Sequence, residues 1–464
     1  MERIENRTFD ELKPGDTASL VRTLTYKDIE VFAIMSGDIN PANVDEAFAK
    51  SAMFHKVVAH GMWGGTLIST LLGTQLPGPG TIYVEQSLHF HQPVGLGDTL
   101  TVTVKVTKKI EGTHRVIFDC RASNQRGEEV ITGTAEVIAP TEKISRPRVV
   151  LPEIELRQKG RRYERLIEMT RGLDPIRTAI VHPVDTPSLL GAVEAARAKL
   201  IIPVMVGPET KIRAAAAQAQ LDLAPYEIVS TEHSDAAAAQ AVAMVRAGQV
   251  EALMKGALHT DELMRAVVDV DRGLRTARRI SHVFAIDAPG YPRPLFITDA
   301  AINVYPTLAD KRDIVQNAIG LAQALGIAEP RVAILSAVET VTEEIRSTLD
   351  AAALCKMADR GQITGGILDG PLAFDNAVSA EAAKTKGIVS PVAGRADIFV
   401  VPDLEAGNML AKQLEYLAEA QIAGIVLGAR VPIILTSRAD KTLARLGSCA
   451  IALLLARHNA GAKP

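Results

Sequence analysis

The pattern of apolar and polar positions changes near residue 140. Before that point apolar and polar residues alternate, as in 100–106, where Leu, Val, Val and Val occupy every second position. The alternation recurs over 116–122 and 130–137. A period of two places these side chains on one face of a strand, so the runs predict an antiparallel sheet with one solvated face. Helical spacing over 26–36 and an apolar stretch over 61–72 predict helices, the second of which packs against that sheet.

After the proline-containing stretch 141–160, short continuous apolar runs alternate with alanine-rich helical stretches. The predicted strands are 178–184, 201–206, 226–229, 252–255, 295–298, 332–335, 398–401 and 431–435. Continuous apolar runs suit strands that are covered on both faces, and their alternation with helices predicts a mostly parallel sheet. The expected fold is an α+β hotdog domain over 1–140, a linker over 141–160, and a two-lobed α/β domain with mostly parallel sheets over 161–464.

Composition narrows the possible partners. A chain of 464 residues with a formal net charge of -3 gives no case for nucleic acid or an anionic membrane surface as a partner. Its three cysteines have no paired spacing, so neither a disulfide framework nor a zinc site is expected. The start of the chain lacks the apolar core of a signal peptide, and no apolar run approaches the roughly 20 residues of a membrane helix. A cytoplasmic protein is expected.

The main candidate site follows the predicted strand 431–435. Ligands of an open parallel sheet bind beyond the carboxyl ends of its strands, and Ser437, Arg438 and Asp440 follow this strand directly. An arginine offers phosphate a bidentate match. The other substrate-binding candidates near strand ends are His259, Thr260, Arg265, Asp299, Asp369 and Asn408. Asp299 and Asp369 equally suit helix caps or braced turns, and Asn408 suits a local hydrogen bond.

Several motifs of 163–460 resemble the phosphate acetyltransferase and phosphate butyryltransferase family. They are Leu253-Met-Lys-Gly256, Phe296-Ile-Thr-Asp-Ala-Ala-Ile-Asn303, Asp369-Gly-Pro-Leu-Ala-Phe-Asp-Asn-Ala377, Leu404-Glu-Ala-Gly-Asn408 and Leu435-Thr-Ser-Arg-Ala-Asp440. The resemblance implies reversible acyl transfer between CoA and inorganic phosphate, without a bound metal or organic cofactor. Ser437 and Arg438 match the family's Ser-Arg pair. Ala444 stands where the acetyl branch has a catalytic Asp, which leaves Asp440 as the carboxylate for thiol activation.

The first domain has its own candidate loop, Asp38-Ile-Asn-Pro-Ala-Asn43, and a second segment, Val58-Ala-His-Gly61-Met62. Both resemble MaoC-like, (R)-specific enoyl-CoA hydratases. The resemblance implies that Asp38 is catalytic, that the Gly61 amide donates to the thioester oxygen, and that the chain forms a homo-oligomer. The family's catalytic His falls on Asn43, whose carboxamide cannot take a proton as imidazole does.

Two interpretations of the first domain stay open. Asp38 alone hydrates a short trans-2-enoyl-CoA at reduced rate, or the domain is a non-catalytic module for CoA binding or oligomerisation. For the second domain, a dehydrogenase is disfavoured because no Gly-x-Gly-x-x-Gly follows a strand. His89 and His91 share a strand face but have no third ligand nearby, so no metal is expected.

Overall fold

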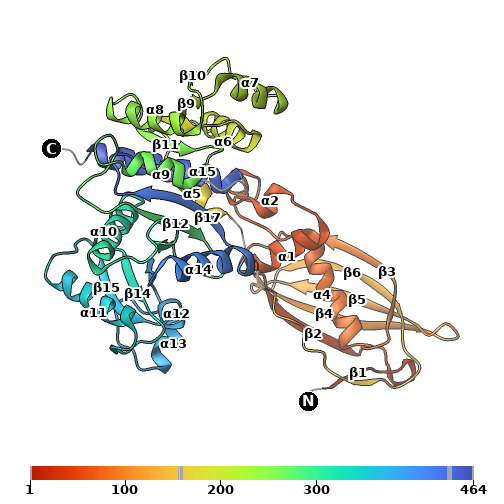
Figure 1. Ribbon diagram of the computed structural model, residues 1–464. Helices are drawn as coiled ribbons and strands as arrows, with labels where there is room; N and C mark the ends of the chain where they lie inside the picture. The colour runs from red at the N-terminus through yellow and green to blue at the C-terminus, as the bar shows by residue number, and fades with distance from the viewer. Residues whose placement is uncertain (1–2, 155, 157–159, 436–441, 462–464) are drawn as a thin grey trace. The chain divides into compact units, whose positions relative to one another are not determined.

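The computed structural model describes residues 3–154, 156, 160–435 and 442–461 (Figure 1). The chain forms two compact units, Met1–Leu156 and Arg157–Pro464. Each unit has its own sheet and core. Within the described residues, no helix combines the length and the apolar character that crossing a membrane requires.

The first unit is built on a five-stranded antiparallel sheet with the order β2-β4-β5-β6-β3. Its strands are β2 (Thr17–Thr23), β3 (Ile82–Phe90), β4 (Thr99–Ile110), β5 (Arg115–Ser123) and β6 (Glu129–Ile138). The alternating apolar side chains of 100–106 are all buried, as are those of 116–122. This alternation gives the sheet one apolar face. The predicted hotdog fold is confirmed.

A central helix, α4 (Gly61–Thr74), covers the apolar face of this sheet. Trp63, Ile68 and Leu71 are buried on its sheet side. Gly64 permits the close approach, because a Cβ there would lie 2.3 Å from Cδ1 of Ile131. The remaining elements are β1 (Arg3–Glu5), η1 (Phe9–Glu11), α1 (Tyr26–Ser36), α2 (Pro41–Val44), α3 (Glu46–Ser51) and β7 (Ser145–Pro147). β7 lies inside the stretch expected to be the linker and pairs with β1.

The second unit contains a continuous eleven-stranded sheet with the order β10-β9-β8-β11-β18-β17-β12-β13-β16-β14-β15. The strands are β8 (Ile176–Val181), β9 (Ile201–Gly207), β10 (Glu227–Ser230), β11 (Ala252–Lys255), β12 (Ser281–Asp287), β13 (Leu295–Thr298), β14 (Arg331–Leu335), β15 (Ile367–Leu372), β16 (Ile398–Val400), β17 (Gln421–Leu427) and β18 (Ile433–Ile434).

Two parallel groups of strands define the two lobes of this sheet. β10, β9, β8, β11 and β18 run in one direction. β13, β16, β14 and β15 run parallel to one another. Between the groups, β17 pairs antiparallel with both β18 and β12, and β12 pairs antiparallel with β13. The predicted mostly parallel α/β architecture is confirmed, and the two lobes share one sheet.

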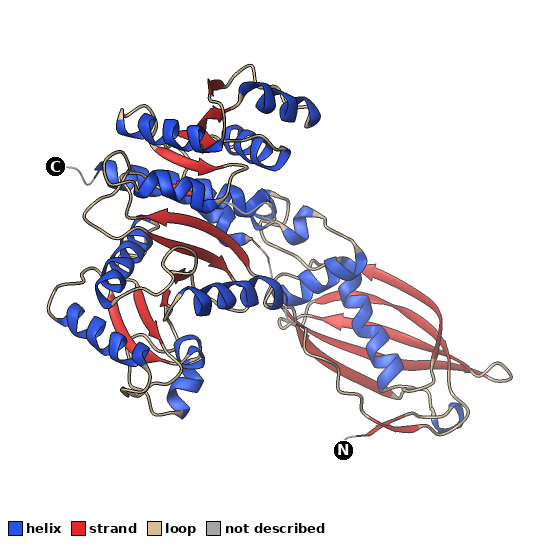
Figure 2. Cartoon of the chain, in the orientation of Figure 1, coloured by secondary structure: helices blue, strands red, loops and turns tan. Residues whose placement is uncertain are grey.

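Helices cover both faces of the sheet (Figure 2). They are α5 (Arg161–Met169), α6 (Thr186–Arg197), α7 (Glu209–Gln218), α8 (Ser234–Arg246), α9 (Thr260–Val268), α10 (Leu308–Ala324), α11 (Arg346–Asp359), α12 (Phe374–Val378), α13 (Ala380–Thr385), α14 (Leu404–Leu417) and α15 (Thr442–Gly461). The neighbours Leu253 and Met254 belong to different hydrophobic clusters. These two residues of β11 therefore face opposite sides of the sheet. Burial on both sides explains why β11 is continuously apolar.

One ion pair is buried between α10 and α11. Nζ of Lys311 lies 2.7 Å from Oδ2 of Asp350, and the two residues are 5% and 8% exposed. Deleting only one partner of a buried ion pair destabilises the protein, because the remaining charge stays buried without a counter-charge.

We expect Lys311→Met to lower the free energy of unfolding by about 3–5 kcal/mol. Adding Asp350→Leu should recover much of that loss, since no unpaired charge then remains. Urea denaturation of the full chain measures both variants. Lys356→Met serves as the control, because Lys356 pairs with Asp359 on the surface. Equal stability of Lys311→Met and the unaltered chain would contradict the expectation.

Candidate functional site

The loop after α1 holds Asp38 at the surface of the first unit. α1 ends at Gly37, whose φ of 75° suits glycine. The amide of Asp38 donates to Oγ of Ser36 at 3.2 Å, and its own Oδ1 accepts from the amide of Asn40 at 3.2 Å. The Asp38 side chain is exposed, so the carboxylate is available to a ligand.

Asn43 is buried, and its carboxamide is occupied by the backbone. Nδ2 of Asn43 donates to the carbonyl of Val58 at 2.8 Å, and the residue is 6% exposed. This contact joins the Asp38 loop to the segment before α4. The Asn43 amide therefore performs a structural task at the position where the resemblance to the hydratases predicts a histidine.

A second link runs from His60, the residue before Gly61. Its Nε2–H donates to the carbonyl of Asp38 at 2.9 Å, and its ring stacks on Phe32 at a centroid distance of 4.9 Å. Gly61 is the first residue of α4, so its amide is one of those that a helix leaves without an intrahelical acceptor. The structure thus brings Asp38, Asn43 and Gly61 together around one short segment.

In the second unit, the residues expected to form the main site follow β18. Ser437, Arg438 and Asp440 lie outside the described residues. β18 is parallel to β11, with Ile434 opposite Met254, so the chain leaves the sheet beside the end of β11. Ala444 is buried in α15.

Three further candidates lie around the start of α9, directly after β11. His259 is the N-cap of α9, and its amide donates to Glu262 at 2.8 Å. Thr260 is the first helical residue. Arg265 is exposed and lies within 4 Å of Asp235 and Asp261. These residues share the sheet edge at which β18 ends.

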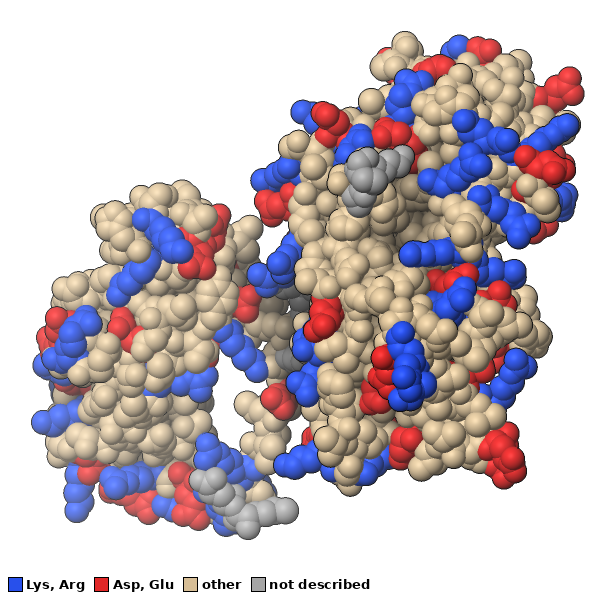
Figure 3. Space-filling model, turned by 90° about the vertical axis from the view of Figure 1, so that its left-hand side faces the viewer, with Lys and Arg blue, Asp and Glu red and all other residues tan. Residues whose placement is uncertain are grey.

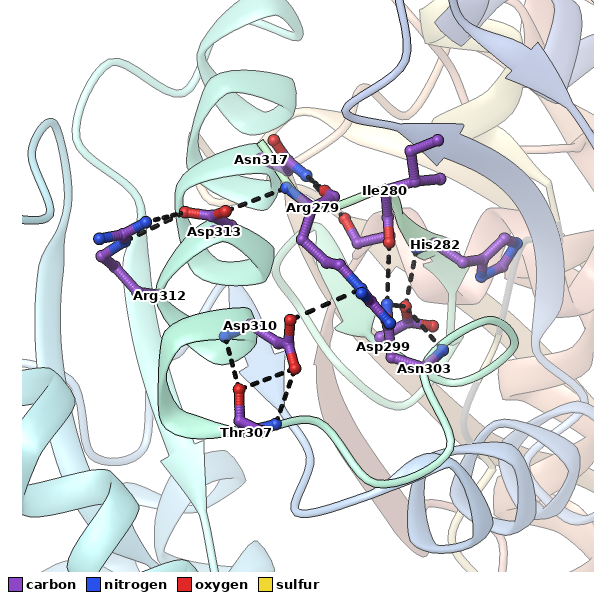
Figure 4. A network of polar contacts seen from close by, with 11 residues as sticks. Arg279, Ile280, His282, Asp299, Asn303, Thr307, Asp310, Arg312, Asp313 and Asn317 are labelled. Atoms are coloured by element: carbon purple, nitrogen blue, oxygen red, sulfur yellow. Dashed lines mark hydrogen bonds and ion pairs between the residues drawn. The ribbon is translucent and has the colours of Figure 1, made fainter. Parts of the chain in front are cut away.

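Asp299 follows β13 and is the centre of a polar network (Figure 4). The residue is 4% exposed. Its Oδ1 accepts from the amides of Ala301 and Ile302, both at 3.0 Å. Its Oδ2 accepts from the amide of His282 at 3.2 Å and from the amide and side chain of Asn303 at 3.3 and 2.6 Å. Burial raises the pKa of Asp299, and these hydrogen bonds oppose the rise.

The network continues outward through Arg279 (Figure 4). Its Nε donates to Oδ1 of Asn303 at 2.8 Å and lies 3.6 Å from Asp310. Asn317 on α10 donates to the carbonyl of Arg279 at 2.9 Å. Burial lowers the pKa of the neighbouring His282 to about 3, so its ring is neutral at neutral pH. The Asp299 carboxylate is therefore saturated by protein donors and braces the turn after β13.

The remaining candidates are spread along the sheet. Asn408 on α14 donates to the carbonyl of Ala300 at 3.3 Å, which joins it to the Asp299 turn. Asp369 lies on the edge strand β15 and accepts from the amide of Gly370. Because β13 is antiparallel to β12, Asp299 lies at the edge of the sheet opposite to the ends of β11 and β18. The structure does not bring Asp299 together with His259.

The sequence pattern does not predict a functional role for two histidines, His60 before α4 and His182 after β8. A single histidine in a sequence does not predict a function, because its role depends on the groups that it contacts in the folded chain. His91 bonds to Thr132. Among the described residues, no group of three or more His, Cys, Asp or Glu side chains is arranged to hold a metal.

Charges of both signs are interspersed over the surface in Figure 3, where Lys and Arg side chains lie beside Asp and Glu. Mixed charge of this kind differs from the continuous basic surface typical of nucleic-acid binding. A small anionic substrate would instead have to be held by a few placed side chains.

Comparison with known families identifies both units. A family model described as "Phosphate acetyl/butaryl transferase" matches residues 230–453, and one described as "MaoC like domain" matches residues 13–124. The fold and these matches define an acyltransferase joined to a hydratase-like domain. The phosphate acetyltransferase of Rhizobium meliloti is 63% identical over 302 residues, which are 65% of this chain and 96% of that protein. The chain therefore belongs to the phosphate acetyl/butyryltransferase family.

Further proteins are similar to parts of this chain. The phosphate butyryltransferase of Clostridium beijerinckii is 40% identical over 65% of this chain and 99% of that protein. A branched-chain phosphotransacylase from Enterococcus faecalis is 29% identical, with a TM-score of 0.54, over 61% of this chain and 99% of its own. The R-hydratase PhaJ1 from Pseudomonas aeruginosa is 41% identical, with a TM-score of 0.33, over 33% of this chain and 99% of its own.

We expect Asp299→Ala to lower the free energy of unfolding by at least about 2 kcal/mol, since it leaves buried donors without an acceptor. Urea denaturation of the full chain measures this loss, and Asp359→Ala, at an exposed carboxylate, is the control. Unchanged stability together with a raised KM for phosphate or CoA would instead assign Asp299 to substrate binding.

Proposed function

We propose that the second unit transfers a short acyl group reversibly between CoA and inorganic phosphate. The observation that carries this proposal is the high identity to a phosphate acetyltransferase over nearly that relative's whole length. Relatives named for acetyl and for butyryl groups both match, so the proposed substrates are short acyl-CoA thioesters. The acyl phosphate carbon is already activated, so placing the two substrates and stabilising charge supply most of the catalysis. The proposal includes no bound cofactor.

Ser437 and Arg438 are the proposed catalytic pair. Arg438 holds the phosphate through its fork of N–H donors, and Ser437 donates a hydrogen bond to the reacting carbonyl or to the thiol. Asp440 is the carboxylate that the sequence offers as a candidate to assist the thiol. His259, Thr260 and Arg265 are proposed substrate-binding residues, and their place beside the end of β11 supports that role.

We expect Arg438→Ala to raise the KM for phosphate by at least about tenfold, because a charge-assisted bidentate contact contributes more than about 1.4 kcal/mol. Phosphate-dependent release of CoA from acetyl-, propionyl- and butyryl-CoA is the assay. Arg430→Ala, in the loop between β17 and β18, is the matched control. Unchanged phosphate kinetics would remove Arg438 from the site.

We further propose that the first unit hydrates a short trans-2-enoyl-CoA, with Asp38 as the acid and base and the Gly61 amide as the donor to the thioester oxygen. The exposed Asp38 carboxylate and the start of α4 beside it support this reaction. Asn43 lowers the rate, because its amide donates to Val58 and does not transfer protons.

A non-catalytic first unit is the alternative, in which this domain only binds CoA or joins copies of the chain. The edge strand β3 favours an assembly role, because Ile82, Tyr83, Val84 and Phe90 on it are exposed. We propose a homo-oligomer in either case.

Crotonyl-CoA hydration by the full chain separates these proposals. Without a second proton-transfer group we expect turnover about 100- to 10,000-fold below that of the Asn43→His variant. Asn43→Gln is the control for size, and transferase activity of the same chains reports folding. No hydration by either chain would leave the non-catalytic interpretation.

A further inference from the structure

The first lobe of the second unit has a topological switch point between β8 and β11. Along the chain, β9 and β10 are added on one side of β8, and β11 is then added on its other side. Ligands of open α/β sheets bind at such a point, beyond the carboxyl ends of the two strands. β18, which leads to Ser437, is the next neighbour of β11. Two strand spacings, about 10 Å, therefore separate the ends of β8 and β18.

His182 is the residue that follows β8 at this switch point. Its backbone joins three strand ends, since its amide donates to Val206 at 2.7 Å and its carbonyl accepts from Ala257 at 2.9 Å. Its φ of 57° lies in the left-handed region. Gly256 permits the close approach of the two loops, because a Cβ there would lie 2.4 Å from the carbonyl oxygen of Val181. The position of His182 is therefore fixed by the fold.

The imidazole of His182 is also fixed. Its Nδ1 lies 3.2 Å from the carbonyl oxygen of Ala257. A carbonyl only accepts, so Nδ1 carries the hydrogen and the lone pair of the neutral ring is on Nε2. Nε2 has no hydrogen-bond partner among the described residues, and His182 is only half-buried. A backbone acceptor on one nitrogen and a free lone pair on the other is the arrangement of a general base.

We propose that His182 is the general base that takes the proton from the CoA thiol in the acyl transfer. Nε2 accepts the thiol proton while the sulfur attacks the acyl carbon. The bond from that carbon to the phosphate oxygen breaks, phosphate leaves with the electron pair, and the proton passes from the imidazolium to phosphate. In the reverse direction His182 returns the proton to the thiolate. This inference rests on the proposed acyl transfer. It supplies a base for the thiol in a chain that has Ala444 where the resemblance to the acetyl branch predicts a catalytic Asp.

The elements around His182 carry charges of both signs. Asp185 caps α6, Lys255 ends β11, Glu209 lies in the first turn of α7, and Glu262 lies in the first turn of α9. Asp440 is the competing candidate for the same proton. The two are distinguishable by substitution, because removing the group that takes the thiol proton removes the acid limb of the rate profile, whereas removing the other group does not.

His182→Asn is the sharpest test. Asn adopts positive φ readily, and its side-chain amide can replace Nδ1 as the donor to Ala257, so the variant should fold while lacking the base. We expect kcat to fall about 100- to 10,000-fold, with the acid limb of the pH profile lost and little change in the KM for phosphate. His233→Asn is the matched control, because His233 caps α8 after β10, at the same sheet edge, and Asn is a good cap.

The outcomes are separable. An unchanged kcat and pH profile in His182→Asn would overturn the inference, as would an acid limb that persists in His182→Asn and disappears in Asp440→Asn. Thermal denaturation of the full chain checks that His182→Asn is folded. If the unaltered chain releases no CoA with phosphate, the proposed acyl transfer itself fails, independently of His182.

Discussion

The antiparallel pairing of β12 with β17 is the constraint on which the second unit depends. Seven residues of each strand pair from Ser281–Leu427 to Asp287–Gln421. Tyr163 fastens the pair from α5, since its hydroxyl lies 2.6 Å from the carbonyl oxygen of Ala285 and 2.9 Å from that of Gln421. Gly424 leaves room for the ring of His282, because a Cβ there would lie 2.9 Å from its Nε2. This pair joins two parallel lobes into one sheet and reverses the strand direction between them.

That reversal decides which polar residues can act together. The carboxyl ends of β8, β11 and β18 share one edge, where His182 and His259 lie. β13 ends at the opposite edge, so Asp299 belongs to a different neighbourhood. There its carboxylate holds a turn together, and the buried neutral ring of His282 lies beside it. The segments that follow β11 and β13 look alike in the sequence, as polar residues after an apolar strand, but they lie at opposite edges of the sheet.

The sequence predicted what depends on local pattern. Alternation identified β4, β5 and β6 of the first unit but not β2 or β3, and continuous apolar runs identified β9, β11 and β13. β12 and β17 were not predicted, because polar residues or glycine interrupt their apolar runs, at Ser281 and His282 in β12 and at Gln421 and Gly424 in β17. The saturation of Asp299 was equally inaccessible, since one of its donors is the amide of His282, 17 residues away. The apolar pattern of a single segment does not show which distant residues that segment will contact.

The two units differ in how the backbone holds the candidate side chain. In the first, the buried carboxamide of Asn43 donates to the carbonyl of Val58 and so joins the Asp38 loop to the segment before α4. In the second, Ala257 orients the ring of His182 through one nitrogen and leaves the other open. Orientation by a backbone carbonyl adds no charge to the site, whereas a carboxylate partner would repel phosphate. The proposed transferase has to hold an anion and deprotonate a thiol at the same place, and an imidazole base held by the main chain suits both requirements.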